Sequence, residues 1–135
     1  MVKRGLLGTV LYRTFPNEPL REAVTERFPG GAVSLVGLRT SSRILEVGCG
    51  SGAFLLRLWE TGFRTLEELD LYVEEHLEYP GELRVMNGSI GVCTGEWDII
   101  TFHYSFEHLP DPLESLKTAM GLLAGRGTIV VRMPP

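Results

Sequence analysis

The stretch R-I-L-E-V-G-C-G-S-G-A-F-L-L-R-L at Arg43–Leu58 constrains the fold more than any other part of the chain. It begins as a short apolar run, passes through three glycines two residues apart, and ends in an amphipathic pattern. This order is typical of a buried parallel strand that leads through a tight turn into a helix. Glycine allows positive φ and close approach of a ligand, and the first N–H groups of the helix can bind an anionic group. A plain glycine-rich turn is the alternative, since one glycine motif is a weak signal.

Composition and charge narrow the class of protein. A chain of 135 residues can bury a real core, so residues 1–135 are predicted to form a single domain. A net charge of −4 argues against nucleic acid and anionic membranes as main partners. No apolar run approaches the roughly 20 residues of a membrane span, and the N-terminus lacks the apolar segment of a signal peptide. We therefore expect a soluble, cytoplasmic protein.

The spacing of candidate ligands does not support metal or disulfide chemistry. Cys49 and Cys93 form neither a metal-ligand pair nor a disulfide framework, and they are expected to act as small buried residues. The histidines and carboxylates have no recognisable metal-ligand spacing either. We predict that no metal is bound.

Further apolar segments follow at the spacing of strands. We expect them at Thr65–Leu69, Glu82–Asn87, Trp97–Tyr104 and Thr128–Met133. Strands interleaved with helices predict an α/β fold, with an open, mostly parallel, three-layer sheet of about five strands.

The first of these segments supports two interpretations. Apolar residues of Phe63–Tyr79 recur at helical spacing: Leu66, Leu69, Val73 and Leu77. That pattern alone favours one long amphipathic helix. A crossover helix should, however, lead into a second parallel strand, and Thr65–Leu69 stands where that strand belongs. The strand is our interpretation, although the adjacent carboxylates Glu67 and Glu68 are unusual in a buried strand.

The clearest helix is predicted at Asp111–Leu123. Asp111 can cap it, and Pro112 suits its first turn. Its core face is expected to consist of Leu113, Leu116, Met120 and Leu123. Gly125 and Gly127 are expected to end the helix before the last strand.

Residues 1–40 are less informative. A helix can begin at Asn17 or Glu18 and carries apolar residues at four-residue spacing: Leu20, Val24 and Phe28. We expect this N-terminal helical segment to pack on the sheet edge, and a lid over a ligand mouth is the functional alternative.

Several polar and glycine-rich segments follow strands directly. They are the glycine turn, Asp70, the Ser89–Ile90 loop and the segment His103–His108. Ligands of open α/β sheets bind outside the carboxyl ends of the strands, so these segments are predicted to meet at one binding edge.

The chain resembles the class I S-adenosylmethionine-dependent methyltransferases, over roughly Arg43 to Pro135. The motifs that carry the resemblance are E-V-G-C-G-S-G at Glu46–Gly52, the acid Asp70, and two later segments. These segments are W-D-I-I-T-F-H-Y-S-F-E-H-L-P-D-P at Trp97–Pro112 and L-L-A-G-R-G-T-I-V-V at Leu122–Val131. The E-H-L-P-D-P sequence is similar to the type 11-like branch, which acts mostly on small molecules and saccharide or lipid precursors.

The resemblance implies a Rossmann-like αβα fold and S-adenosyl-L-methionine as cofactor. Glu46 would help to hold the amino group, and Asp70 would accept hydrogen bonds from the ribose. Leu71 and Ile90 would sandwich the adenine, with Ser89 near its edge. The residues that the resemblance implies at the cofactor are Glu46, Gly48, Cys49, Gly50, Gly52, Asp70, Leu71, Ser89, Ile90 and His103.

The chain departs from the family pattern at several positions. Glu68 stands where glycine is usual, Leu71 where proline is frequent, and Ser89 where an acid commonly contacts the adenine. The chain also stops before the last two strands that the family normally has. Thr128–Met133 would then be an exposed edge strand, and pairing through such an edge predicts a homodimer.

The catalytic candidates are His103 and His108, because histidine titrates near neutral pH. A packed ring beside the cofactor is the alternative for His103, and a structural partner of the following helix start is the alternative for His108. The function that fits best is methyl transfer to a small-molecule or saccharide- or lipid-precursor acceptor. One alternative is a catalytically inactive methyltransferase-like scaffold, and another is an NAD-dependent oxidoreductase. The glycines argue against the oxidoreductase, because they follow the spacing G-x-G-x-G and not the G-x-G-x-x-G spacing of dinucleotide-binding proteins.

Overall fold

The computed structural model describes residues 2–4, 11–13, 39–48, 52–60, 62–74, 77–78 and 83–134. The expected helix from Asn17 or Glu18 to Phe28 lies outside these residues, as do Cys49 and Gly50 of the glycine turn. Two short strands occupy part of the N-terminal segment, β1 (Val2–Arg4) and β2 (Leu11–Arg13), and they pair antiparallel.

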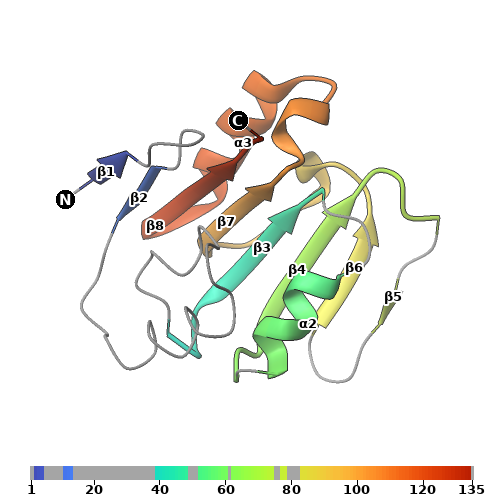
Figure 1. The fold of residues 1–135 in the computed structure, drawn as a ribbon, viewed down its shortest axis with the longest axis vertical. Coiled ribbons are helices and arrows are strands. Elements are labelled where there is room, and N and C mark those ends of the chain that lie inside the picture. Colours follow the sequence, from blue (N-terminus) through green and yellow to red (C-terminus); the bar gives the residue numbers. More distant parts are fainter. Residues whose placement is uncertain are drawn as a thin grey trace.

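A six-stranded sheet with the order β5-β6-β4-β3-β7-β8 forms the centre of the molecule (Figure 1). Its strands are β3 (Arg43–Val47), β4 (Thr65–Asp70), β5 (Leu77–Glu78), β6 (Leu83–Asn87), β7 (Trp97–His103) and β8 (Leu123–Arg132). Five of them pair in parallel, and only the two-residue β5 runs antiparallel to its neighbour β6. The predicted mostly parallel sheet of about five strands is therefore confirmed, with β5 as an addition that the sequence pattern did not indicate.

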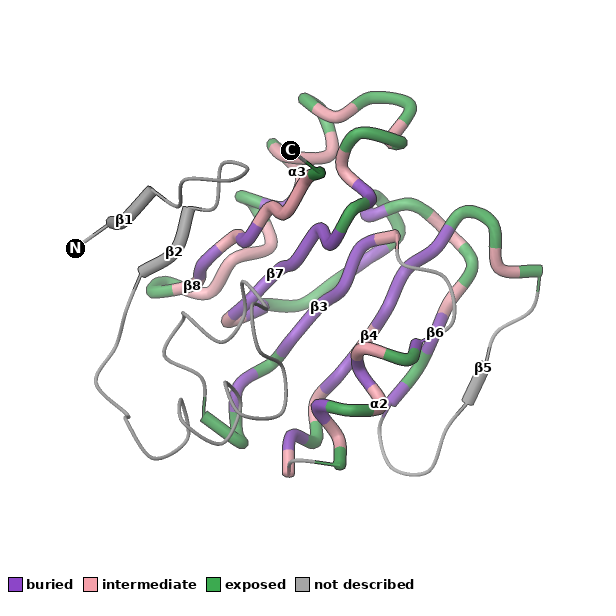
Figure 2. Tube along the Cα trace, in the orientation of Figure 1, coloured by how far each residue is buried: buried purple, intermediate pink, exposed green. Residues whose placement is uncertain are grey.

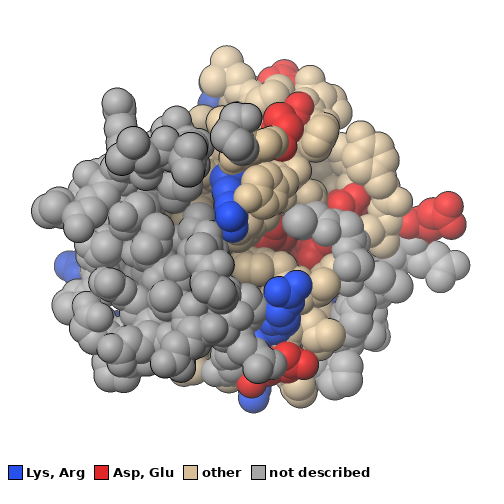
Figure 3. All heavy atoms as spheres, viewed as in Figure 1, with Lys and Arg blue, Asp and Glu red and all other residues tan. Residues whose placement is uncertain are grey.

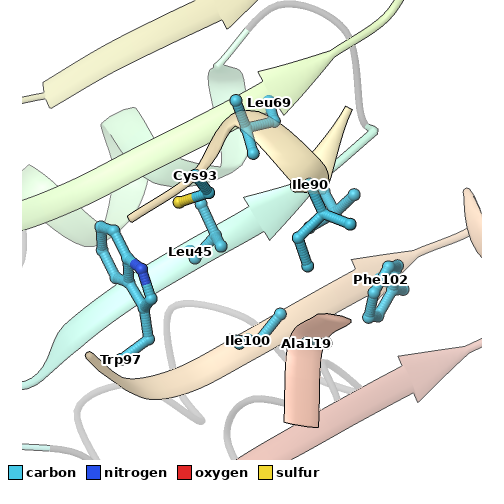
Figure 4. Packing of buried hydrophobic residues seen from close by; sticks show 9 residues of the cluster. Leu45, Leu69, Ile90, Cys93, Trp97, Ile100, Phe102 and Ala119 are labelled. Carbon is cyan, nitrogen blue, oxygen red and sulfur yellow. The ribbon is translucent and has the colours of Figure 1, made fainter. Parts of the chain in front are cut away.

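In the part of the chain that the structure describes, one helix covers each face of the sheet. Helix α2 (Ala53–Glu60) buries Leu55 and Leu58 against a cluster that includes Ile44 and Leu66. Helix α3 (Pro112–Leu122) lies against the other face, where Ala119 packs into the second cluster. Figure 4 shows that second cluster, and Figure 2 shows that the central strands β3, β4 and β7 are the most buried part of the trace. Side chains alternate between the two faces of a strand, so each of these strands supplies both clusters.

Strand β4 settles the ambiguity of Phe63–Tyr79. Its backbone pairs with β3 on one side and with β6 on the other. Leu66 and Leu69 are 0% exposed, one on each face of the strand. Pairing on both sides buries these apolar residues more completely than an isolated amphipathic helix could, so tertiary context overrides the helical spacing. Glu68 is also fully buried, whereas Glu67 is half-buried.

The predicted core face of α3 is wrong at Leu113 and Met120, whereas Leu116 is half-buried and Leu123 packs against the core. Leu113 and Met120 are each 63% exposed, and Ala119 is the one α3 residue that is fully buried. Helix α3 packs against β8 and the short 3-10 turn η2 (Ile90–Val92), so its buried stripe is centred one residue before Met120. Because this buried stripe is centred on the small Ala119, the larger side chains of Leu113 and Met120 point toward solvent.

The end of α3 also differs from the prediction. The helix ends at Leu122, and β8 begins at Leu123 rather than at Thr128, so the two glycines lie inside the strand. Leu123 pairs with Trp97, and regular pairing resumes between Thr128 and Ile99. Residues between these two points bulge out of the ladder, which accommodates Gly125 and Gly127 without breaking the strand.

Strand β8 lies at one edge of the six-stranded sheet, and β2 lies beside it (Figure 1). The two strands belong to separate hydrogen-bonded sheets. Pairing of this edge with a second copy of the chain stays a prediction.

Candidate functional site

A cavity of about 420 Å³ opens at the carboxyl ends of β3 and β4. The loop after β6, the 3-10 turn η3 (Phe106–His108) and the start of α3 complete its wall. The lining residues are Val47, Gly48, Leu69, Asp70, Leu71, Tyr72, Gly88, Ser89, Ile90, Gly91, Ser105, His108, Leu109, Pro110, Asp111, Glu114, Ser115 and Thr118. This is the sheet edge at which open α/β folds bind ligands, and the volume is in the range of small-molecule sites.

The backbone at Gly48 requires glycine. Its φ is +77°, and a Cβ added there would lie 3.0 Å from the Cβ of Ser105. The Gly48 N–H donates to the carbonyl of Leu69 at 2.6 Å, which ties the turn to the end of β4. The Ser105 hydroxyl donates to the carbonyl of Val47 and ties the segment after β7 to β3. A side chain at position 48 would push these ends apart and fill the mouth of the cavity.

Asp70 organises the turn that follows β4. The residue is 5% exposed, and its Oδ1 accepts a hydrogen bond from the Tyr72 N–H at 2.7 Å. Its carbonyl accepts the N–H of Gly88 at 3.1 Å, which links the turn to the loop after β6. A carboxylate is therefore fixed at the cavity wall, in a position that can accept hydrogen bonds from ligand hydroxyls.

Apolar side chains form much of the remaining wall. Ile90 is buried at 3% exposure in η2, and Leu71 is 38% exposed beside Asp70. Leu109 and Pro110 line the wall from the segment between η3 and α3. Ser89 adds a hydroxyl to this apolar lining. A flat apolar ring with polar atoms at its edge suits such a wall.

The face of β3 that helix α2 covers carries a buried polar cluster. Glu46 is 0% exposed, and its Oε2 accepts a hydrogen bond from the hydroxyl of Thr101. The Nδ1 atom of His103 lies 3.7 Å from the same oxygen, and the His103 ring centre is 4.7 Å from that of Phe54. Glu46 and His103 belong to the face covered by α2 and do not line the cavity.

His108 has the opposite environment. It lines the cavity, its side chain is 73% exposed, and its Nε2 lies 3.9 Å from Oε1 of Glu107. The two histidine candidates are therefore separated: His108 lies at the open cavity, and His103 is buried beside Glu46. Of these two histidines, only His108 lines the cavity.

A further carboxylate, Glu68, sits beside Glu46 and is fully buried. Burial raises the pKa of Glu68 from 4.5 to about 7, and the neighbouring carboxylates Glu46 and Asp70 add to the rise. The Gly52 amide partly offsets it, although neither oxygen of Glu68 has a hydrogen-bond partner in the described part of the chain. The Glu68 carboxyl therefore changes its protonation near neutral pH.

The structure brings six of the predicted site residues to one cavity: Gly48, Asp70, Leu71, Ser89, Ile90 and His108. Glu46, Gly52 and His103 lie outside the cavity lining, and Cys49 and Gly50 are not among the described residues. Gly52 has φ +73° and begins the turn into α2. The roles of all these residues stay predictions.

Sequence reasoning missed part of the wall. The cavity is also lined by Tyr72, Leu109, Pro110, Glu114, Ser115 and Thr118. A signal existed for Leu109 and Pro110, because they directly follow the segment His103–His108 that was predicted at the binding edge. The α3 residues had no such signal, because their side of the helix was predicted from apolar spacing alone.

The described residues contain no group of three His, Cys, Asp or Glu side chains that could hold a metal ion. Within the same residues, no helix has both the length and the apolar character needed to span a membrane.

A comparison with family models assigns the chain to a family. A family model described as a methyltransferase domain matches residues 13–135. A search of curated protein sequences finds no match.

Solved structures share the fold at low sequence identity. The sugar N-methyltransferase KedS8 from a Streptoalloteichus species is 19% identical with a TM-score of 0.54, and the match covers 86% of this chain and 46% of that one. The plantazolicin methyltransferase BpumL, solved with a substrate analogue and SAH, is 22% identical with a TM-score of 0.63, over 85% of this chain and 48% of that one. CalS10, an amino pentose methyltransferase from Micromonospora echinaspora solved with SAM, is 19% identical with a TM-score of 0.54. The match covers 86% of this chain and 48% of that one. The chain thus spans about half the length of these structures.

Proposed function

The chain belongs to the family of methyltransferase domains, and from this premise we propose that it binds S-adenosylmethionine and transfers a methyl group to a small-molecule acceptor. The observation that carries the proposal is the cavity at the carboxyl edge of the sheet, which is bounded by Gly48, Asp70 and Ile90. Family membership alone does not locate the ligand, and the position and lining of the cavity support this location for the cofactor.

The residues around the cavity fit the parts of this cofactor. Asp70 holds a buried carboxylate at the end of β4, suited to the two ribose hydroxyls. Leu71 and Ile90 offer apolar surfaces for the adenine, with the Ser89 hydroxyl near its edge. Positive φ at Gly48 leaves the space that the methionine part needs at the turn.

The cofactor would supply an electrophilic methyl group on a sulfonium, so the chain has little covalent chemistry to perform. Its contribution is to hold the donor and the acceptor in line, which supplies most of the rate enhancement in such a displacement. A general base is needed only when the acceptor loses a proton. His108 is the better placed candidate, since it lines the cavity and is exposed, whereas His103 is 8% exposed beside Glu46.

The acceptor class that we propose is a saccharide or another small polar natural-product precursor. Support comes from the structural neighbours described as sugar and amino pentose methyltransferases. We also propose that residues 1–135 act as one domain. This chain spans about half the length of those neighbours, so both the acceptor class and the single domain are proposals.

An inactive methyltransferase-like scaffold is the second candidate. Buried Glu68 favours it, because a carboxylate now stands where the family usually has glycine under the turn. Cofactor binding without turnover is the behaviour expected of such a scaffold.

Calorimetric titration with S-adenosylmethionine, S-adenosylhomocysteine and NAD tests the cofactor assignment. We expect the first two to bind and NAD not to bind. Asp70→Ala should weaken binding about tenfold or more, the effect of losing hydrogen bonds to a charged group. The exposed Glu96, in the loop before β7, provides the matched control as Glu96→Ala.

If neither S-adenosylmethionine nor S-adenosylhomocysteine binds, the proposal is contradicted. When binding is established, transfer of a labelled methyl group to a panel of amino sugars separates the two candidates. Product formation supports the enzyme, and binding without product supports the scaffold.

A further inference from the structure

Glu46 and Glu68 form a pair of buried carboxylates at the centre of the sheet. They are register partners on the neighbouring parallel strands β3 and β4, so their side chains leave the same face of the sheet. Both are 0% exposed. Adjacent strands lie only about 4.8 Å apart, which places the two acids side by side.

Most of the oxygen atoms of this pair have no hydrogen-bond partner. Within the described residues, Oε1 of Glu46 and both oxygens of Glu68 are buried and unpartnered. The hydroxyl of Thr101 donates to Oε2 of Glu46 only. Buried polar atoms are nearly always paired in native proteins, so three such oxygens in one place point to a missing donor group.

The surrounding described residues supply no compensating positive charge to Glu68. The next acid on its own strand, Asp70, adds negative charge, and the paired position on β6 is Val85. His103 on β7 faces the pair from the far side of β3, with Nδ1 3.7 Å from Oε2 of Glu46. The first turn of α2 has no ionisable side chain before the exposed Arg57.

Two ionised carboxylates in this position are strongly disfavoured, because burial and mutual repulsion act in the same direction. A proton on Glu68, whose pKa burial raises to about 7, lowers that cost. A cation placed against the unpartnered oxygens would replace the proton and satisfy the oxygens together.

The two described glycines of the glycine turn, Gly48 and Gly52, lie near this pair. Gly48 follows Glu46 by two residues, and Gly52 is close enough to Glu68 to influence its ionisation. On the face seen in Figure 3, acidic side chains lie in a hollow over β3 and β4, with basic side chains above and below it. The methionine part of the proposed cofactor carries an ammonium group and would lie at this turn.

We propose that Glu68 is a second carboxylate for the ammonium group of the bound cofactor, and that cofactor binding releases one proton from Glu68. The proposal rests on the function proposed above and adds a residue to that site which the family pattern does not assign. The proton balance is simple: one proton leaves the Glu68 carboxyl for solvent as one ammonium group takes its place.

The test compares S-adenosylhomocysteine with 5′-methylthioadenosine, which has the same nucleoside but no amino-acid ammonium group. Both are titrated calorimetrically between pH 5.5 and 7.5 into the wild-type chain, Glu68→Gln and Glu67→Gln. Glu67 is the matched control, since it is the adjacent acid on β4 and its side chain points to the other face.

For the wild-type chain we expect the affinity for S-adenosylhomocysteine to rise about tenfold per pH unit until it levels near pH 7. Titration in buffers of different ionisation enthalpy should show release of about one proton at pH 6. Glu68→Gln should remove this pH dependence and weaken binding about tenfold at pH 7.5. Neither change is expected for 5′-methylthioadenosine or for Glu67→Gln.

Two results overturn the proposal in distinguishable ways. If both ligands bind but Glu68→Gln leaves the affinity for S-adenosylhomocysteine and its pH dependence unchanged, Glu68 has no such role and the proposed function stands. If neither ligand binds the folded wild-type chain, the proposed function fails and the role of Glu68 fails with it. A circular dichroism spectrum of each variant checks that it is folded.

Discussion

Replacing Glu68 by glutamine is expected to stabilise the ligand-free protein at neutral and alkaline pH. Glutamine keeps the size and polarity of a protonated glutamate but cannot ionise. Burial and the nearby Glu46 raise the pKa of Glu68 from 4.5 to about 7. In the unfolded chain the carboxyl returns to its ordinary value, so the folded state binds the proton more tightly than the unfolded state does.

The sign and size of the effect follow from this difference. Below pH 4.5, Glu68 is protonated in both states and costs no stability. As the pH rises from 4.5 to about 7, the unfolded state ionises first and the wild-type chain loses free energy of unfolding. At 1.36 kcal/mol per pH unit, the rise of about 2.5 pH units amounts to about 3 kcal/mol above pH 7. That is a large share of a typical domain's stability.

Urea denaturation at pH 5, 6, 7 and 8 measures this loss. The wild-type chain and the control Glu67→Gln should lose stability between pH 5 and 7 relative to Glu68→Gln, and the gap should then stay constant. A Glu68→Gln variant that is no more stable than the wild-type chain at pH 8 would refute the reasoning. Curves that stay parallel at every pH would refute it equally.

Three further substitutions test individual contacts by urea denaturation. Gly48→Ala should cost roughly 1–3 kcal/mol, because an L residue at φ +77° is strained and its methyl group meets Ser105 at 3.0 Å. Thr101→Val should cost about 1–3 kcal/mol, because it leaves another oxygen of buried Glu46 without a donor. Asp111→Ala should cost about 1 kcal/mol, because its Oδ1 caps the first turn of α3 at 3.0 Å. If the free energy of unfolding of a variant changes by less than a few tenths of a kcal/mol, the role given to that contact is wrong.

The parallel sheet could be predicted because its signals are local. The apolar run of β3, the glycine turn and the amphipathic start of α2 occur in an order that few other folds produce. The strand predicted at Thr65–Leu69, which is β4, followed from the need for a second parallel strand, against the helical spacing of its own residues.

Other features depend on packing that the sequence does not display. The buried stripe of α3 is set by what the helix meets, so Met120 is exposed although it lies at core spacing. Residues of α3 reach the cavity wall because the helix begins near the carboxyl edge of the sheet, after β7. Glu68 was conspicuous in the sequence as an acid in a buried strand, yet its pairing with Glu46 required the register of β3 and β4.

A crystal structure of the chain with S-adenosylhomocysteine tests the central claim most directly. We predict the adenine between Leu71 and Ile90 in the cavity, and the ribose hydroxyls on the carboxylate of Asp70. The amino group should lie at Glu46, on the side of the glycine turn. A ligand bound outside this cavity, or an adenine that does not contact Leu71 and Ile90, would contradict the assignment of the site.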